Sequence, residues 1–316
     1  MPEGAGWRLG ALCAAAIAVA FAYLALNIRG DIAFALELRG VRLAGLVTVA
    51  TAIGVSTVLF QTITGNRILT PSIMGIDALY VFGQTALIFA LGGLGFASLD
   101  PRLKFLADVG LLMALSLALV LPMLKARLDM TLLLLAGVVA GVLFRSLAAL
   151  LSRLIDPNDF SIAQVASFAS FTTIRPDLLA IAAIVTAVGV AIAWRARHVL
   201  DVLALGRDAA TGLGVDWRRA TAGLMAVTAA LVAASTALVG PVVFLGLVVV
   251  ALAERAVGTR RHAALIPAAA LVGAIALVGG QALLQHGLGG ATSLGIVIEF
   301  VGGIMFLALL FLEVRR

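Results

Sequence analysis

Long apolar runs separated by short polar segments make up most of the chain. The runs are about 20 residues long, the length that crosses the hydrocarbon core of a bilayer as a helix. They are continuous rather than alternating at every second position, which predicts membrane-spanning helices and not barrel strands. About ten spans are expected; the eighth is short. They fall near residues 9–28, 43–62, 73–95, 105–124, 131–151, 178–195, 219–239, 242–254, 264–284 and 294–312.

The first run follows Arg8 and has some features of a secretory signal. It is long for a signal core, however, and "LNIRGDIAFA" after it offers no convincing small-residue cleavage site. We therefore expect the first run to be retained as a helix.

Composition agrees with a membrane protein. Of 316 residues, 63% are hydrophobic and 12% charged, with a mean hydropathy of +1.16, far more apolar than a soluble domain. The expectation is an all-α polytopic membrane protein that forms a single transmembrane domain over residues 1–316. Loops expected on the inner side carry about twice as many Lys and Arg as the outer loops, which predicts cytoplasmic termini. The net charge of +6 therefore indicates topology rather than nucleic-acid binding.

Common catalytic motifs are missing from the sequence. It contains no G-x-x-x-x-G-K-[ST] phosphate loop, no H-E-x-x-H and no G-x-S-x-G. Cys13 is the only cysteine, so no intrachain disulfide can form. His198, His262 and His286 lack metal-ligand spacing and are expected to be solvated surface residues in loops. No cofactor, no metal site and no enzyme activity of the chain itself are expected.

Four ionisable residues fall in or near the expected spans: Asp77, Arg145, Glu254 and Glu299. Such residues are expensive in a bilayer and often functional. No pair recurs with the spacing of a proton relay, and local pairing or snorkelling is the favoured interpretation. If the chain is a transporter, its energy source is then expected to lie outside the chain.

Four polar segments nevertheless carry unusual residues. In "LRGVRLAG", Arg39 and Arg42 mark the expected outer entrance of the second span. "QTITGNRILTPS" at 61–72 joins two spans and carries a mixture of polar and apolar side chains that a plain reverse turn does not need. Gly65 and Pro71 are expected to break the helices there. "LDMTLLLLAGVVAG" contains Gly137 and Gly141, whose spacing permits close helix contact. The cytoplasmic loop at about 196–218 is expected to hold a helix over 201–211 that Gly212 and Gly214 end. Its apolar side (Leu203, Leu205, Leu213) has two equally favoured interpretations. It is either a docking surface for a soluble partner or part of a plain surface loop.

Several stretches resemble one family in the same order. "LRGVRLAG … FQTITGNRILTPSIMGIDA" is similar to the R-x-P-R … Q … N-P-L-x-x-P-x-x-x-G stretch of the iron-chelate (siderophore), haem and cobalamin uptake permeases of ABC importers. "LLLLAGVVAGVLFRSL", "VLALGRDAATGLGV", "LVGPVVFLGLVV" and "TRRHAALIPAAALVGA" resemble later motifs of that family. The resemblance covers residues 36–312 and is nearest to the permeases for catechol-type ferric siderophores.

The resemblance implies a type II ABC importer permease fold in the bacterial cytoplasmic (inner) membrane. It implies a second permease subunit, a heterodimer being favoured, with two ATP-binding cassette ATPases and a periplasmic or lipid-anchored siderophore-binding protein. It places the cytoplasmic gate at four residues, docking of the binding protein at two arginines, and ATPase coupling on one loop. These residues are, for the gate, Asn66, Ile68, Met130 and Thr131; for docking, Arg39 and Arg42; and for coupling, Leu205, Gly206, Arg207, Gly212, Leu213 and Gly214.

Some positions depart from the family pattern. Gly40 and Val41 replace the x-P of R-x-P-R, and Arg67 stands where proline is usual. Gln281 and Gln285 stand where Asp and Arg are common, which removes one expected contact with the binding protein. The alternatives to siderophore import are an ion-coupled secondary transporter, and an ABC permease for cobalamin or haem. A membrane enzyme is a third class, but it would need a polar catalytic cluster that the sequence lacks.

Overall fold

The computed structural model describes residues 4–27, 31–125, 130–287 and 293–314, and all secondary structure in these ranges is helical. Each of the ten expected spans corresponds to a helix. Seven helices in the described ranges are long and apolar enough to cross a membrane. The ten are α1 (Ala5–Ala25), α2 (Ile32–Thr64), α3 (Ile76–Ser98), α4 (Pro101–Lys125), α5 (Met130–Ser152), α7 (Pro176–Arg195), α10 (Trp217–Val239), α11 (Leu245–Val257), α12 (His262–Gly287) and α13 (Leu294–Val314).

The short helices η1 (Pro71–Met74), α6 (Pro157–Ala166), α8 (Arg197–Leu203) and α9 (Arg207–Gly212) lie between these long helices. The sequence interpretation missed α6, although its start carries a recognisable signal. The Asp156 side chain accepts a hydrogen bond from the Asn158 backbone N–H, and Pro157 occupies the first turn. Both features favour a helix N-terminus.

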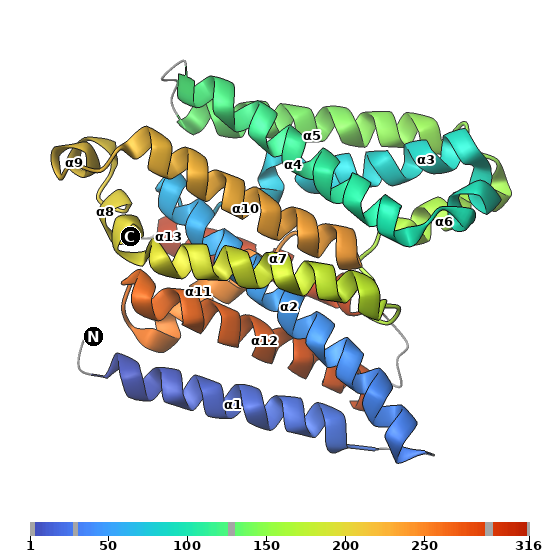
Figure 1. The fold of residues 1–316 in the computed structure, drawn as a ribbon, viewed down its shortest axis with the longest axis horizontal. Coiled ribbons are helices and arrows are strands. Elements are labelled where there is room, and N and C mark those ends of the chain that lie inside the picture. The colour runs from blue at the N-terminus through green and yellow to red at the C-terminus, as the bar shows by residue number, and fades with distance from the viewer. Residues whose placement is uncertain (1–3, 28–30, 126–129, 288–292, 315–316) are drawn as a thin grey trace.

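Helix α2 lies at the centre of the molecule. It packs against α12, α10, α7 and α11, while α1 lies along α12 on one side and α3, α4 and α5 form the opposite side (Figure 1). With 33 residues it is about 50 Å long at 1.5 Å per residue. The expected span began at residue 43, but the helix already begins at Ile32. Arg39 and Arg42 therefore lie inside α2 rather than in a loop at its entrance.

Small residues set the distance between α2 and α12. A Cβ atom on Gly54 of α2 would lie 2.9 Å from the Ala269 carbonyl oxygen. One on Gly273 of α12 would lie 3.0 Å from the Ala50 carbonyl oxygen. Because neither glycine has a side chain, the two backbones approach closely, as is common between helices in membranes. The pair forms the centre of the buried core.

Candidate functional site: the gate turn and the coupling segment

The gate turn (residues 61–72) has a defined conformation. Gly65 adopts φ +64° and ends α2, as the sequence predicted. The Asn66 Oδ1 atom accepts a hydrogen bond from the Ile68 N–H at 3.0 Å, and the Gln61 side-chain amide donates to the Arg67 carbonyl at 2.6 Å. Asn66 and Arg67 are exposed and Ile68 is half-buried. The turn thus presents a polar tip beside an apolar side chain.

Pro71 opens η1 immediately after this turn, which confirms the second predicted break. Helix η1 packs against the middle of α5. A Cβ on Gly137 would lie 2.8 Å from the Met74 Cα, and one on Gly75 would lie 2.8 Å from the Gly141 backbone nitrogen. The glycine spacing in α5 therefore provides the predicted close contact, but its partner is η1 and the turn after it rather than a long helix.

Met130 and Thr131, the other two predicted gate residues, open α5. Their side chains lie outside the part of the chain that the structure describes. Whether they meet Asn66 and Ile68 therefore stays a prediction.

The coupling segment (residues 196–218) folds as two short helices, which corrects the single helix expected over 201–211. Gly206 adopts φ +95° and separates α8 from α9, and Gly214 at φ +84° follows α9. Leu205 and Leu213 are each 63% exposed. Leu203 is a correction, because it is 4% exposed and packs in the core rather than on the surface. The remaining predicted coupling residues, Gly206, Arg207, Gly212 and Gly214, are exposed.

His262 joins the coupling segment to the gate side of α2. It is buried, which corrects the expectation of a solvated loop residue. Its Nδ1 atom lies 2.6 Å from Asp201 Oδ1 on α8, and its Nε2 atom lies 2.7 Å from the Thr62 hydroxyl at the end of α2. The His262 backbone N–H donates to the same Asp201 oxygen at 2.9 Å. One side chain at the start of α12 thus contacts both α8 and the helix that leads into the gate turn.

The other two histidines differ from each other. His198 is exposed on α8, as expected. His286 lies in the last turn of α12 rather than in a loop, and it is only half exposed.

At the opposite end of α2, Arg39 holds the end of α1. Its guanidinium donates to the carbonyls of Tyr23, Leu24 and Leu26 at 2.7–3.2 Å and to that of Asn27 at 3.1 Å. Tyr23 and Leu24 are in the last turn of α1, whose carbonyls lack partners within the helix, and Leu26 and Asn27 follow directly after it. Arg39 is 7% exposed and hydrogen-bonded within the chain, and its docking to a binding protein stays a prediction.

Arg42 lies one turn further along α2 and is half-buried beside the buried Tyr23. Among the described residues, four buried polar atoms at or near this end of α1, α2 and α12 lack hydrogen-bond partners within the chain: Tyr23 Oη, Arg42 Nε, Gln285 Oε1 and His286 Nε2. Docking of a binding protein here remains a prediction for Arg42. Unpaired polar groups are consistent with it, since such groups usually have a partner or water.

Two carboxylates in the helices are accounted for by neighbours. Glu254 lies 3.9 Å from Arg260, which confirms local pairing for this residue. Asp108 on α4, which the sequence interpretation missed, is buried and accepts two hydrogen bonds of 3.0 Å from the Gln84 amide on α3. The pair is a polar contact between two adjacent helices. No sequence spacing would have revealed it, because the residues are 24 positions apart.

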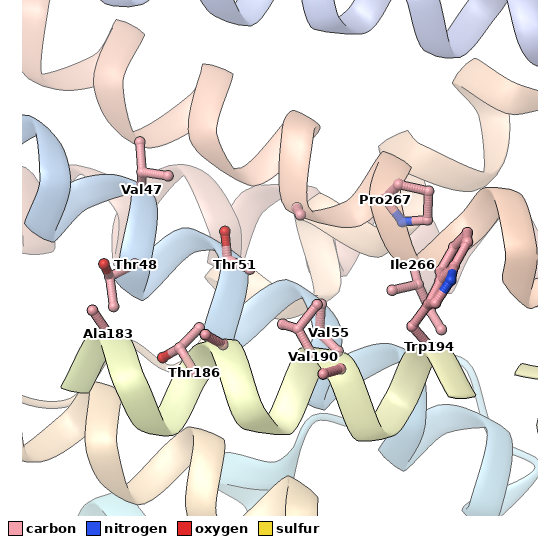
Figure 2. A pocket seen from close by; sticks show the side chains of 13 residues that line it. Val47, Thr48, Thr51, Val55, Ala183, Thr186, Val190, Trp194, Ile266 and Pro267 are labelled. Carbon is pink, nitrogen blue, oxygen red and sulfur yellow. The ribbon is translucent and has the colours of Figure 1, made fainter. Parts of the chain in front are cut away.

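A groove of about 530 Å³ lies between α2, α7 and α12 (Figure 2). Threonine hydroxyls and the Trp194 indole are its main polar side-chain groups, and the rest of its lining is apolar. It is lined by Val47, Thr48, Thr51, Val55, Ala183, Thr186, Ala187, Val190, Ala191, Trp194, Ile266, Pro267 and Ala270. Without a charged lining residue it does not suit a hydrophilic metal chelate.

Comparison with known proteins agrees with this arrangement of helices. Over residues 10–312 the chain matches the FecCD transport family. It is 40% identical over 285 residues to the petrobactin import system permease protein YclO of Bacillus subtilis, covering 90% of each chain. It is 30% identical to the petrobactin permease FatC of Bacillus anthracis (86% of this chain, 77% of FatC). Its identity to the vitamin B12 permease BtuC of Vibrio cholerae is also 30% (87% and 81%).

A solved metal-chelate type ABC transporter in an inward-facing conformation has the same fold. The TM-score is 0.82 at 21% identity, covering 97% of this chain and 99% of the solved one. The fold and the relatives define a polytopic permease of ABC importer type. The chain belongs to the FecCD transport family.

Proposed function

We propose that this chain is the permease subunit that carries a catechol-type ferric siderophore inward across the bacterial inner membrane. The observation that carries the proposal is its identity of 40% with a petrobactin import permease over 90% of both chains. The nearest alternative cargo is cobalamin, since a vitamin B12 permease is 30% identical.

The energy is supplied by two ATPase subunits that dock on the coupling segment. Leu205 and Leu213 support this, because two large apolar side chains exposed next to short helices suit a protein contact. A second permease subunit, in a heterodimer, completes the path, and a siderophore-binding protein delivers the chelate at the Arg42 end. Both termini lie in the cytoplasm, and Asn66, Ile68, Met130 and Thr131 close the inner mouth.

The docking proposal is tested by paired substitutions in the coupling segment. Leu205→Asp with Leu213→Asp should abolish co-purification of the ATPase and leave the melting temperature of the permease unchanged, because both side chains are exposed. Leu203→Asp, two residues from Leu205, should instead lower the melting temperature, because Leu203 is buried. Undiminished ATPase recovery with the double variant would show that the ATPase docks elsewhere.

The cargo is tested in vesicles that contain the complete importer, prepared with the partner subunits encoded beside the gene. ATP-driven uptake of ferric petrobactin, without uptake of cobalamin or haem, is the expected result. Accumulation that follows an ion gradient and needs no ATP would replace the proposal by a secondary transporter.

A further inference from the structure

Arg145 is an exposed charge in the interior of a membrane helix. It lies seven residues before the end of α5 at Ser152, about 10 Å along the helix axis, and is exposed. Its exposed neighbours on α5, Val142 at 55% and Leu143 at 54%, are apolar. An arginine at such a depth is unfavourable against lipid, and such residues usually face a water-filled cavity or the interior of an assembly.

The Arg145 side chain does not turn toward the near end of α5. A guanidinium nitrogen lies 3.4 Å from the position that a Cβ on Gly141 would take, one turn back toward the middle of the helix. Gly141 in turn packs against Gly75, directly before α3. A snorkelling arginine would extend the other way, toward Ser152. The snorkelling interpretation of Arg145 is therefore wrong.

Two carboxylates lie on other helices. Asp77, in the first turn of α3, is buried, and Gly75, two residues before it, packs against Gly141 of α5. The Asp77 Oδ2 atom has no hydrogen-bond partner. Glu299 lies on α13 and is half-buried. Among the described ion pairs none includes any of these three residues.

None of the three ionisable residues lines the apolar groove in Figure 2, which lies between α2, α7 and α12. They come from α3, α5 and α13, and α5 and α13 both expose large apolar side chains that no other helix of this chain covers. A helix face that is uncovered in one subunit, yet carries an exposed arginine far from the helix end, fits a surface that becomes the wall of a hydrated path when a second permease subunit is present.

We propose that Arg145 is an anion contact in the translocation path, where it meets the negatively charged iron(III) chelate as it passes from the binding protein to the gate turn. This proposal rests on the function proposed above. An iron(III) complex with two or more catecholate donors is an anion, because each catecholate brings two negative charges against the three positive charges of the metal ion. Asp77 and Glu299 limit how tightly the chelate is held, since carboxylates nearby weaken binding of an anion. Passage needs a contact that attracts the cargo and still releases it.

The first test compares variants in vesicles that hold the complete importer. Arg145→Gln should lower ATP-driven uptake of ferric petrobactin at least about tenfold, the change that about 1.4 kcal/mol produces. Arg145→Lys should retain most of the uptake because it keeps the charge. Arg153→Gln is the matched control, because it removes an exposed arginine just beyond the end of the same helix and should change nothing. Equal uptake by Arg145→Gln and the parent would overturn the proposal. Failure of the parent to take up ferric petrobactin would instead overturn the proposed function.

A second test compares reagents of opposite charge on one and the same variant, so that an effect of the substitution on folding is common to both. Arg145→Cys is introduced with Cys13→Ser, which removes the only native cysteine, and the assembled importer is then treated with small water-soluble thiol reagents. A cationic reagent should restore uptake, and an anionic reagent of similar size should lower it further. Failure of both reagents to reach the cysteine, or the same effect from both, would show that Arg145 faces lipid or protein and contacts no anion.

Discussion

The contact of His262 with Asp201 and Thr62 should hold the coupling segment on the transmembrane helices. We consider Asp201→Ala, His262→Ala and the double variant. Asp201 Oδ1 receives two N–H groups from His262, at 2.6 and 2.9 Å. Hydrogen bonds to charged groups contribute about 1.5–3 kcal/mol. The Asp201 side chain is 33% exposed, so water can replace part of the hydrogen bonding that a substitution removes. The expected loss of free energy is therefore the lower value, about 1.5 kcal/mol.

A loss of free energy of that size can be measured as faster hydrogen exchange of backbone amides. Exchange of the α8 amides should become about tenfold faster in either single variant, since 1.4 kcal/mol corresponds to a factor of ten in a local opening equilibrium. The double variant should release α8 no more easily than Asp201→Ala with the effect of the Thr62 contact added, because Asp201→Ala already removes both hydrogen bonds to His262, including the one from the backbone N–H that His262→Ala retains. Uptake should fall while ATP hydrolysis by the bound ATPase continues.

His198→Ala is the matched control for this experiment, because His198 lies on the same short helix and is exposed. It should leave both exchange and uptake unchanged. Additive effects of the two substitutions in the double variant would refute the reasoning, since they would mean that Asp201 and His262 stabilise the protein independently.

Two further predictions concern the packing of single residues. Arg39→Gln should lower the stability by about 2–3 kcal/mol, measured by thermal unfolding in detergent, because four carbonyls around the end of α1 lose a charged donor. Arg153→Gln, at an exposed site, should have no effect, and an equal loss in both would contradict the capping role. Gly137→Ala should impair uptake, because the new Cβ would lie 2.8 Å from the Met74 backbone and displace η1. Gly110→Ala, where a Cβ meets nothing within 4 Å, should be neutral; unimpaired uptake by Gly137→Ala would mean that η1 need not pack closely on α5.

The features that could be predicted from the sequence are those that depend on local chemistry. A continuous apolar run must be helical in a bilayer, because every backbone polar group has to be paired, and so the ten expected spans coincide with helices. Gly65 acts through its freedom to adopt a positive φ and Pro71 through its fixed φ and missing N–H, and both breaks are present. The exposure of Leu205 and Leu213 agrees with their place in a short polar loop between two spans.

The features that could not be predicted depend on partners far away in the sequence. The partners of His262 are 61 and 200 positions away, so its isolation from other histidines said nothing about its burial. Arg39 looked accessible because α2 was expected to begin later and the end of α1 was not placed against it. The break between α8 and α9 occurs at Gly206 within a stretch of helix-forming residues, where only the backbone conformation distinguishes one helix from two.

The placement of His262 explains why a polar contact lies at the end of α12 rather than in its middle. Along their length, α2 and α12 are held by close backbone contacts at Gly54 and Gly273, and such packing leaves no freedom for one helix to slide on the other. A displacement of α8 would therefore move the two helices together, provided that α8 is fixed to the helix ends that carry Thr62 and His262. Apolar contacts of Leu200 and Leu203 bury α8 but do not set its register. The directional hydrogen bonds of His262 to Asp201 and Thr62 do, and Thr62 lies within the gate turn, three residues before Gly65, the glycine that ends α2.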